Sequence, residues 1–492
     1  MAFQWVYIAN LRGPQGIQGP AGEAWVRAAL PNATNLDTWD TSGISPIVGF
    51  TAANSMTPTK PPVLATGNYG HAKTGANNAI QEWDTTATPI QSWKRVKNGG
   101  VWGHFRRTDA PEPLSLMHLS RSAGTTYFEN ATAGHVRFPF RVGTTLESVV
   151  VNIENKDDRT NTAYTGAVTI TSVWFGAAEI VNGELTGKYS GTPTQVLTSF
   201  ALPTDGTKYT SIEIPRTVFK FDPHVSYLVS FGFTTDGANY HRSIGGCWRG
   251  AFSTEAGSTN PSTLQQGKFA PFTTWFNVRA KAPRFAMLGD SHTTANNALF
   301  PVYQSPINLY ALANGGVPVN IGHGGSQLTD WRSVNQYKYQ KYQVTLAPED
   351  SIRALAQTAV RVDGLIIQGS QNDLYNAGVT LATLRDNLIV TANACRTVFG
   401  PNIWAATMMP RNGSNQTPAQ DAVRIQYNDW LRTLPAQIVG VVDFAAAIAD
   451  PANPSAIDSR YVDPVDLTHL TTAGCWRLAQ TIPSGFGRNV TY

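Results

Sequence analysis

The residues best suited to covalent chemistry lie in four short segments in the C-terminal part of the chain. Ser291 follows a Gly-Asp pair, two glycines occupy 324–325, Asn372 lies in a Gln-Asn-Asp run, and His469 comes three residues after Asp466. A serine hydroxyl becomes a nucleophile when a histidine removes its proton and a carboxylate fixes the tautomer of that histidine. These residue types therefore predict Ser291 as the nucleophile, His469 as the base and Asp466 as the acid that orients the base.

Acyl transfer also needs hydrogen-bond donors for the negative oxygen of its tetrahedral intermediate. The backbone amides of Ser291 and Gly325 and the side-chain amide of Asn372 could supply these donors. A glycine at 325 lets the backbone approach a ligand closely. Gly324 is a rival for the same role.

Other polar residues of these segments have more ordinary interpretations. Asp290 and Asp373 suit turn capping better than catalysis. Asp463 competes with Asp466 for the orienting role, and the spacing from the histidine favours Asp466. His323 could line the pocket, but we expect a solvated loop histidine. Because no His or Cys pair has a metal-ligand spacing, we expect no metal and no other cofactor.

The elements that must position these residues follow Lys281. Short apolar runs predict strands at 284–288, 317–321, 364–368, 403–408 and 438–444. Apolar residues recur at steps of three or four over 381–399, which predicts a helix with Cys395 buried on its apolar stripe. Alternating strands and helices predict a doubly wound α/β parallel sheet, with its active site at the carboxyl ends of the strands.

The four segments, in this order, resemble those of the SGNH (GDSL-like) hydrolase superfamily over roughly residues 284–490. The resemblance implies a flavodoxin-like SGNH hydrolase fold and serine ester hydrolysis of the carboxylesterase or acetylesterase type. It implies the roles already given for Ser291, Gly325, Asn372, His469 and Asp466. His292 is a departure, because many members carry leucine there. No Gly-x-Ser-x-Gly elbow occurs, which disfavours an α/β-hydrolase.

Glycine occupies every third position near the start of the chain, at Gly13, Gly16, Gly19 and Gly22. Only glycine fits the crowded axis of a collagen triple helix, so this period predicts a collagen-like segment and a homotrimer. A flexible linker is the alternative. Four triplets are marginal alone, so neighbouring modules must also hold the trimer.

Two β-rich parts lie between these ends. Residues 24–110 predict a β-rich module that loosely resembles the trimeric knobs of phage tail fibres. Over 111–280, apolar residues such as Val136 and Phe138 alternate with polar ones, which predicts an antiparallel β-sandwich with one buried and one wet face. Such a sandwich could bind carbohydrate. The chain is thus expected to divide into 1–23, 24–110, 111–280 and 281–492.

The composition restricts the possible partners. Charged residues make up 14% of the chain and the net charge is +4, without a clustered basic patch, so we expect no nucleic-acid partner. No run approaches the ~18 apolar residues of a membrane span. The low charge implies a surface of uncharged polar residues, which suits an extracellular or particle-borne protein.

Residues 5–12, followed by the glycine triplets, resemble the start of minor tail proteins of phages that infect actinobacteria. The resemblance implies a virion location at the tail tip or fibre, with other phage tail proteins as partners. The predicted function is a virion serine esterase that deacylates a host cell-envelope polysaccharide or glycolipid.

Two alternatives remain for the function. A non-catalytic receptor-binding adhesin on the same fold is disfavoured, because it has no need of the complete set of catalytic groups. A secreted bacterial esterase with a collagen-like stalk is disfavoured, because residues 1–10 lack the pattern of a signal peptide.

Overall fold

The computed structural model describes residues 115–122, 132–157, 162–164, 166–236, 243–250, 260, 264–333 and 362–487, and the backbone of six short strands before residue 108. The glycine triplets lie outside these residues. The chain falls into two compact units, of which the first holds those six strands and the second holds every other described element. The strands of the first unit form one antiparallel sheet in the order β1-β2-β3-β4-β5, with β6 beside β4. Their bounds are β1 (Gly43–Ile47), β2 (Gly67–Gly75), β3 (Asn78–Thr85), β4 (Ser92–Asn98), β5 (Val101–Trp102) and β6 (Arg106–Arg107).

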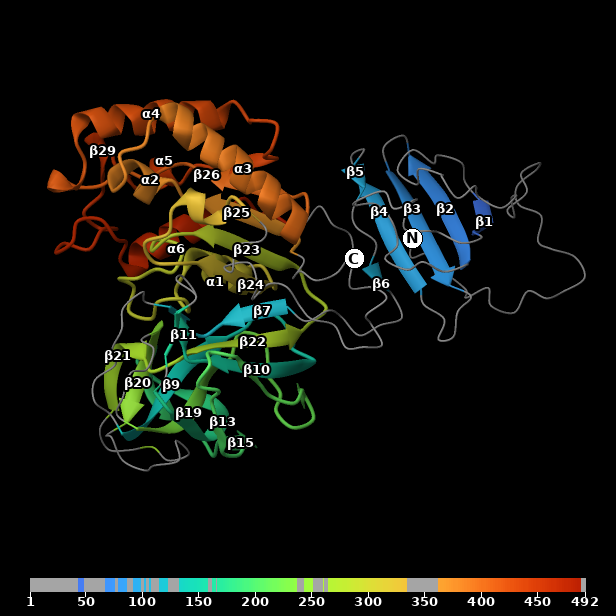
Figure 1. The fold of residues 1–492 in the computed structure, drawn as a ribbon, viewed down its shortest axis with the longest axis vertical. Coiled ribbons are helices and arrows are strands. Elements are labelled where there is room, and N and C mark those ends of the chain that lie inside the picture. The colour runs from blue at the N-terminus through green and yellow to red at the C-terminus, as the bar shows by residue number, and fades with distance from the viewer. Residues whose placement is uncertain are drawn as a thin grey trace, which may run out of the picture. The chain divides into compact units, whose positions relative to one another are not determined.

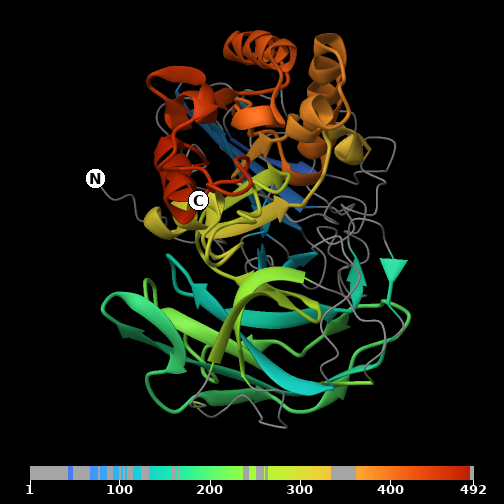
Figure 2. The same ribbon diagram turned by 90° about the vertical axis from the view of Figure 1, so that its left-hand side faces the viewer.

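The second unit begins with two antiparallel sheets, as the alternating pattern predicts (Figures 1 and 2). The smaller sheet contains β17 (Tyr209–Thr210), β10 (Ser148–Glu154), β22 (Thr273–Arg279) and β7 (Ser115–His118), with β18 (Ile214–Pro215) beside β10. The larger sheet contains β14 (Glu184–Tyr189), β13 (Val168–Val181), β19 (Ser226–Thr235), β9 (Ala133–Arg141), β20 (Ser243–Gly250) and β21 (Leu264–Ala270). Short strands extend it, namely β15 (Thr194–Leu197) and β16 (Phe200–Ala201) on β13, and β8 (Arg121–Ser122) on β20. A separate pair joins β11 (Lys156–Asp157) to β12 (Thr162–Ala163).

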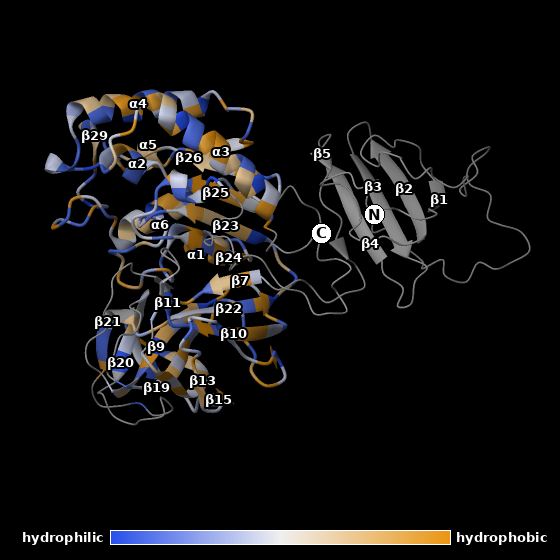
Figure 3. Ribbon diagram, viewed as in Figure 1, coloured by the Kyte–Doolittle hydropathy of each residue, from blue (hydrophilic) through white to orange (hydrophobic). Residues whose placement is uncertain are grey.

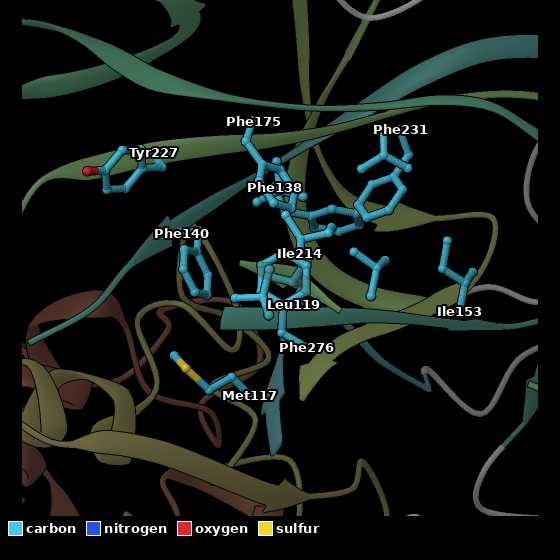
Figure 4. Packing of buried hydrophobic residues seen from close by; sticks show 14 of the residues in the cluster. Met117, Leu119, Phe138, Phe140, Ile153, Phe175, Ile214, Tyr227, Phe231 and Phe276 are labelled. Carbon is cyan, nitrogen blue, oxygen red and sulfur yellow. The ribbon is translucent and has the colours of Figure 1, made fainter. Parts of the chain in front are cut away.

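Aromatic side chains from both sheets fill the sandwich core (Figure 4). Phe138 of β9 meets Phe231 of β19 edge to face, with ring centroids 5.9 Å apart. Phe140 reaches across to Phe276 of β22 at 5.1 Å. Burying one such side chain contributes roughly 1.5–3 kcal/mol, so this core is a main source of the sandwich's stability.

The expectation that one face of β9 is exposed to solvent is wrong, because the polar residues of that face are also buried. Arg137 is 0% exposed, and its Nη1 donates to the carbonyl of Gly187 at 3.0 Å. The same guanidinium lies 4.5 Å from the ring centroid of Tyr189. Burial lowers the pKa of the neighbouring His135 to about 4. The β13–β14 hairpin, which the periodicity of β9 cannot reveal, provides this cover.

Five parallel strands form the sheet of the C-terminal part, in the order β24-β23-β25-β26-β27. Their bounds are β23 (Arg284–Gly289), β24 (Val317–Gly322), β25 (Gly364–Gln368), β26 (Ile403–Ala406) and β27 (Gly440–Val442). The doubly wound parallel sheet predicted here is confirmed. Its last strand is shorter than expected, because the Asp443 carboxylate accepts from the amide of Ala446 and starts a helix there.

Helices cover both faces of this sheet. Phe285 and Met287 pack against one layer, and Ala286 and Leu288 against the other. The first layer holds α1 (Pro306–Ala313), α5 (Phe444–Ile448) and α6 (Thr472–Thr481), and the second holds α3 (Leu381–Phe399) and α4 (Pro418–Arg432). Helix α3 has the predicted bounds and buries Cys395. Figure 3 shows both polar and apolar residues along α3 and α4, as expected of helices with one buried face.

The remaining elements of the second unit are short. They are α2 (Gln371–Tyr375), the 3₁₀ helices η2 (Leu328–Trp331) and η5 (Gly413–Asn415), and the strands β28 (Ala449–Asp450) and β29 (Asn453–Ile457). None of the helices in the described ranges is long and apolar enough to cross a membrane.

The sandwich and the parallel sheet share buried residues. Leu116 of β7 and Trp275 of β22 belong to the same hydrophobic cluster as Leu288 of β23 and Val319 and Ile321 of β24. The smaller sheet of the sandwich therefore closes part of the core of the parallel sheet.

Candidate active site

Three of the predicted residues form a hydrogen-bonded chain at the carboxyl end of the parallel sheet. The Oγ of Ser291, directly beyond β23, lies 2.8 Å from Nε2 of His469. The Nδ1 of that imidazole lies 2.6 Å from Oδ2 of Asp466. With Nδ1 protonated, the ring donates to the carboxylate and its Nε2 can accept the serine proton. These contacts are the geometry that a serine nucleophile and a histidine base require.

The loop before α6 fixes the carboxylate of Asp466. Its Oδ1 accepts from the amides of Thr468 and His469, both at 2.9 Å. The rival Asp463 turns the same loop, because its Oδ1 accepts from the amide of Val465 at 2.8 Å. Asp466 therefore contacts the imidazole, and Asp463 shapes the turn that presents it.

The surroundings keep Asp466 ionised. Burial opposes its charge, but the amides of His469 and Thr468 and the imidazole of His469 outweigh that cost and lower the pKa of Asp466 to about 2. The carboxylate is thus negatively charged at neutral pH, where it can stabilise an imidazolium.

Asn297 is a further member of the site that the sequence did not indicate. Its Nδ2 donates to Oδ2 of Asp466 at 2.6 Å and to Oδ2 of Asp463 at 3.0 Å. The residue lies on the loop that follows the nucleophile, far from the two aspartates in sequence. It therefore ties the loop of Ser291 to the loop of His469.

The end of β23 is tightly packed around Gly289. A Cβ atom there would lie 1.8 Å from the backbone oxygen of Gln368 and 2.3 Å from Oγ1 of Thr293. Only glycine permits this approach, which places Ser291 beside the end of β25. Asp290 caps the turn as expected, since its Oδ1 accepts from the amide of His292 at 2.9 Å. Burial raises the pKa of Asp290 to about 6.

Two of the three predicted oxyanion donors, Gly325 and Asn372, lie just beyond the ends of the two strands that flank β23. Nδ2 of Asn372 donates to the carbonyl of Ser326 at 2.9 Å, which holds α2 against the loop containing Gly325. Gly325 has a φ of 75°, a conformation that favours glycine. Oδ1 of Asn372 accepts from Nδ2 of Asn376 at 2.9 Å, so the orientation of the amide is fixed. The donor roles, and the choice of Gly325 over Gly324, stay predictions.

Two neighbouring polar residues have structural contacts. Asp373 accepts from the amide of Leu328 at 2.9 Å and from Nδ2 of Asn387 at 3.0 Å, in line with the structural interpretation. His323 is 1% exposed, so the expectation of a solvated loop histidine is wrong. Its amide donates to the carbonyl of Gly289 at 2.9 Å, which draws the residue inward at the end of β24.

His292 packs beside the candidate base. The ring centroids of His292 and His469 are 5.3 Å apart, with an angle of 33° between the rings. Burial lowers the pKa of His292 well below its usual value, so the ring is neutral. A neutral ring provides a packing surface of the kind that leucine would provide, which makes this departure compatible with the proposed chemistry.

Arg411, after β26, is another site residue that the sequence did not indicate. Its Nη2 lies 3.4 Å from Oδ1 of Asn372, and its guanidinium lies 4.5 Å from the ring centroid of Tyr375. Burial lowers the pKa of Arg411. The arginine thus contacts the oxygen of the Asn372 side-chain amide, and the nitrogen of the same amide is the candidate oxyanion donor.

The arrangement suits acyl transfer by side chains alone. It combines a serine held on a histidine, an ionised carboxylate behind the histidine, and an amide fixed on the adjacent strand end. Within the described ranges, no three His, Cys, Asp or Glu side chains are grouped as metal ligands.

Comparison with known proteins gives only distant likenesses. No protein family model matches the sequence, and no curated protein matches it. Among solved structures, it is similar to a carbohydrate esterase family 2 enzyme with a carbohydrate-binding domain from Corynascus thermopiles (Myceliophthora fergusii), at 15% identity over 75% of this chain and 97% of that one, with a TM-score of 0.31.

The chain is also similar to a family two carbohydrate esterase from Clostridium thermocellum in complex with cellohexaose. The identity is 14% over 69% of this chain and 91% of that one, with a TM-score of 0.30. A third similar structure is that of a protein from Desulfitobacterium hafniense DCB-2, described as lipolytic and of the G-D-S-L family. The identity is 15% over 42% of this chain and 99% of that one, with a TM-score of 0.29. At this level of agreement, the assignment of a reaction depends on the side-chain geometry of Ser291, His469 and Asp466.

Proposed function

We propose that this chain is a serine-dependent hydrolase of carboxylic esters. The observation that carries the proposal is the chain of contacts from Ser291 Oγ to His469 Nε2, at 2.8 Å, and from His469 Nδ1 to Asp466, at 2.6 Å. Each member has the chemistry that its position requires, and the carboxylate is ionised at neutral pH.

The reaction proceeds in two stages. Ser291 Oγ attacks the ester carbonyl carbon while its proton passes to His469 Nε2, and the carbonyl electron pair moves to the oxygen. The C–O bond to the alcohol then breaks, and His469 returns the proton to the departing oxygen. A water molecule repeats the sequence on the acyl-serine and releases the carboxylic acid. Asp466 stabilises the imidazolium, and Asn372 donates to the anionic oxygen.

The test is hydrolysis of p-nitrophenyl acetate by the purified full chain without added metal. Ser291→Ala should abolish turnover and leave the circular dichroism spectrum and the melting temperature unchanged. Ser484→Ala is a matched control, because Ser484 is exposed in the same unit. Turnover that survives in Ser291→Ala, or that EDTA abolishes in the wild type, would contradict the proposal.

The biological setting of this activity is a further part of the proposal. The protein is a phage tail component that removes acyl groups from a host cell-envelope polysaccharide or glycolipid. The support is the sequence alone, namely the resemblance of residues 5–12 and the glycine triplets that follow. Purified envelope fractions should release acetate or fatty acid on treatment with the wild type and not with Ser291→Ala. Binding to the envelope without release would favour the adhesin alternative.

The same setting includes a homotrimer. Light scattering on the full chain should give three times the protomer mass of 53.2 kDa. Gly16→Ala with Gly19→Ala should weaken the assembly, because only glycine fits the axis of a collagen helix. Gln18→Ala is the control within the segment. A monomeric wild-type chain would overturn the collagen interpretation.

A further inference from the structure

A cavity of about 370 Å³ adjoins the candidate active site. Its wall contains Arg411, whose Nη2 lies 3.4 Å from Oδ1 of Asn372. It also contains Asn412, whose amide donates at 3.0 Å to the carbonyl of Leu467, between the candidate acid and base. Ser291 and His469 do not line the cavity, so it is a neighbouring compartment and not the reaction centre itself. Its size lies within the range of small-ligand sites.

The lining is polar. It contains no leucine, isoleucine, valine, methionine or aromatic residue, and its other members include Gln416, Asp421 and Ser455. An alkyl chain in such a cavity would find apolar side chains to pack against only at Pro418 and Ala456. The part of a substrate that occupies it is therefore polar, as a sugar ring is.

Most of the polar groups in the wall are already engaged by the protein. Oε1 of Gln416 accepts from the hydroxyl of Tyr375 at 2.8 Å, and its Nε2 donates to the carbonyl of Ser455 at 2.9 Å. Asn412 exchanges two hydrogen bonds with the backbone of Ile457. These amides hold the wall in place and have little capacity left for a ligand.

The one acidic residue among the lining residues is also neutralised. Asp421 pairs with Arg424 of the same helix at 2.6 Å, and both side chains are nearly buried. The hydroxyl of Ser455 donates to the other carboxylate oxygen. Asp421 therefore contributes no free negative charge to the cavity.

Arg411 differs from these groups, because in the described part of the chain it forms no ion pair. Its nearest acceptors are uncharged amide oxygens, those of Asn372 at 3.4 Å and Asn376 at 3.3 Å, and its buried Nε has no hydrogen-bond partner in the same residues. The carboxylates that influence it from a greater distance are Asp290 and Asp466. The Arg411 side chain is half-buried, and a planar guanidinium can bind an oxyanion through two parallel hydrogen bonds.

We propose that Arg411 and this cavity form a subsite for a carboxylate or phosphate group that the ester substrate carries close to its scissile bond. The inference rests on the proposed esterase function and narrows it to acylated acidic substrates of polar, sugar-like character. The anionic group can belong to the alcohol part or to the acyl part of the ester.

The experiment compares two pairs of esters that differ in charge. The pair 4-acetoxybenzoate and its methyl ester places the charge on the alcohol part, and the pair mono-p-nitrophenyl succinate and p-nitrophenyl methyl succinate places it on the acyl part. For each pair, the ratio of kcat/KM for the charged ester to that for the neutral one is measured in the wild type, Arg411→Gln and Arg411→Lys. Arg432→Gln is a control of equal charge, because Arg432 is an exposed arginine that already pairs with Asp429 and Asp443.

We expect the glutamine variant to lower the ratio roughly tenfold or more for one of the two pairs, mainly through KM for the charged ester, because a charge-assisted hydrogen bond is lost. The ratio for Arg411→Lys should lie between those of the wild type and Arg411→Gln, because lysine keeps the charge but lacks the planar guanidinium. Arg432→Gln should leave the ratio unchanged. An equal loss for both members of each pair would show that Arg411 acts only on Asn372 and would overturn the subsite.

A binding measurement separates the subsite from the reaction. Calorimetry on Ser291→Ala compares glucuronate with glucose, and glucuronate binding should disappear when Arg411→Gln is added. A chain that binds glucuronate through Arg411 but hydrolyses no ester would contradict the esterase and retain the subsite. A chain that hydrolyses esters but shows neither a charge preference nor glucuronate binding that depends on Arg411 would contradict the subsite alone.

Discussion

Asn297 and His469 contact the same carboxylate oxygen, Oδ2 of Asp466, each at 2.6 Å. One of the two groups comes from the loop after the nucleophile and the other from the loop before α6. The acid that orients the base is thus also bonded to the segment that carries Ser291. A shift of either loop would disturb the distance between Ser291 and His469, so this shared oxygen links the positions of the two candidate catalytic residues.

Asp466→Asn should lower kcat by about 10⁴-fold, because an amide does not select the tautomer in which Nε2 accepts the serine proton. Asp463→Asn is the comparison, since its remaining oxygen can still accept from the amide of Val465 and only its contact with Asn297 is lost. The measurement is steady-state hydrolysis of p-nitrophenyl acetate by both variants. A greater loss in Asp463→Asn would reassign the orienting role to that residue.

Asn372→Ala should lower kcat by roughly 10²–10³-fold, as the loss of one oxyanion donor does elsewhere. KM should change little, because the donor interacts more strongly with the transition state than with the ester. Asn376→Ala should have a smaller effect on kcat, since Arg411 still contacts Oδ1 of Asn372. Asp373→Asn should leave kcat nearly unchanged. If Asp373 is essential and Asn372 is not, the third segment has been misinterpreted.

The rate of ester hydrolysis should rise with pH, because the base must be neutral to accept the serine proton. The ionisation of Asp466 does not affect the rate between about pH 5 and 8, since the pKa of Asp466 is about 2. The pH profile of kcat/KM from about 5 to 8 provides the measurement. A flat profile would contradict histidine as the base.

Asp290→Asn should change how stability depends on pH. Burial raises the pKa of Asp290 from 3.8 to about 6, so the folded chain holds this proton to higher pH than the unfolded chain does. The contribution of Asp290 to stability therefore falls as the pH rises from about 4 to 6, by up to roughly 3 kcal/mol. The asparagine variant avoids this loss and keeps an acceptor for the amide of His292.

Urea unfolding of the wild type and Asp290→Asn at pH 4, 6 and 8 measures the effect. The variant should gain stability relative to the wild type between pH 4 and 6 and keep that gain at pH 8. Parallel stability curves across this range would show that Asp290 titrates normally in the folded chain.

The sequence pattern within a segment predicts those helices and strands whose bounds depend on that segment alone. The bounds of α3 follow from its apolar period, and the position of Ser291 at a strand end follows from the apolar run at 284–288. The apolar run at 438–444 does not predict the end of β27, because the helix cap of Asp443 ends the strand at Val442. The burial of His323 cannot be read from its own segment, because it depends on a hydrogen bond to the carbonyl of Gly289 in β23.

The two additional site residues escaped prediction for a related reason. Asn297 and Arg411 lie in loops without periodicity, and an asparagine or arginine in a loop is ordinarily solvated. Their partners, Asp466 and Asn372, are distant in sequence. Only the assembled sheet, which brings the strand ends together, places these residues beside their partners.

The buried cluster that joins Leu116 and Trp275 of the sandwich to Val319 and Ile321 of the parallel sheet limits how this protein can be recombined. Separating the chain between β22 and β23 would expose apolar surface on both parts, so neither part can be exchanged between proteins by itself. Heat or urea should therefore unfold the two parts in one cooperative transition. A protein engineer who wished to move the parallel-sheet part to another protein would have to transplant the sandwich with it.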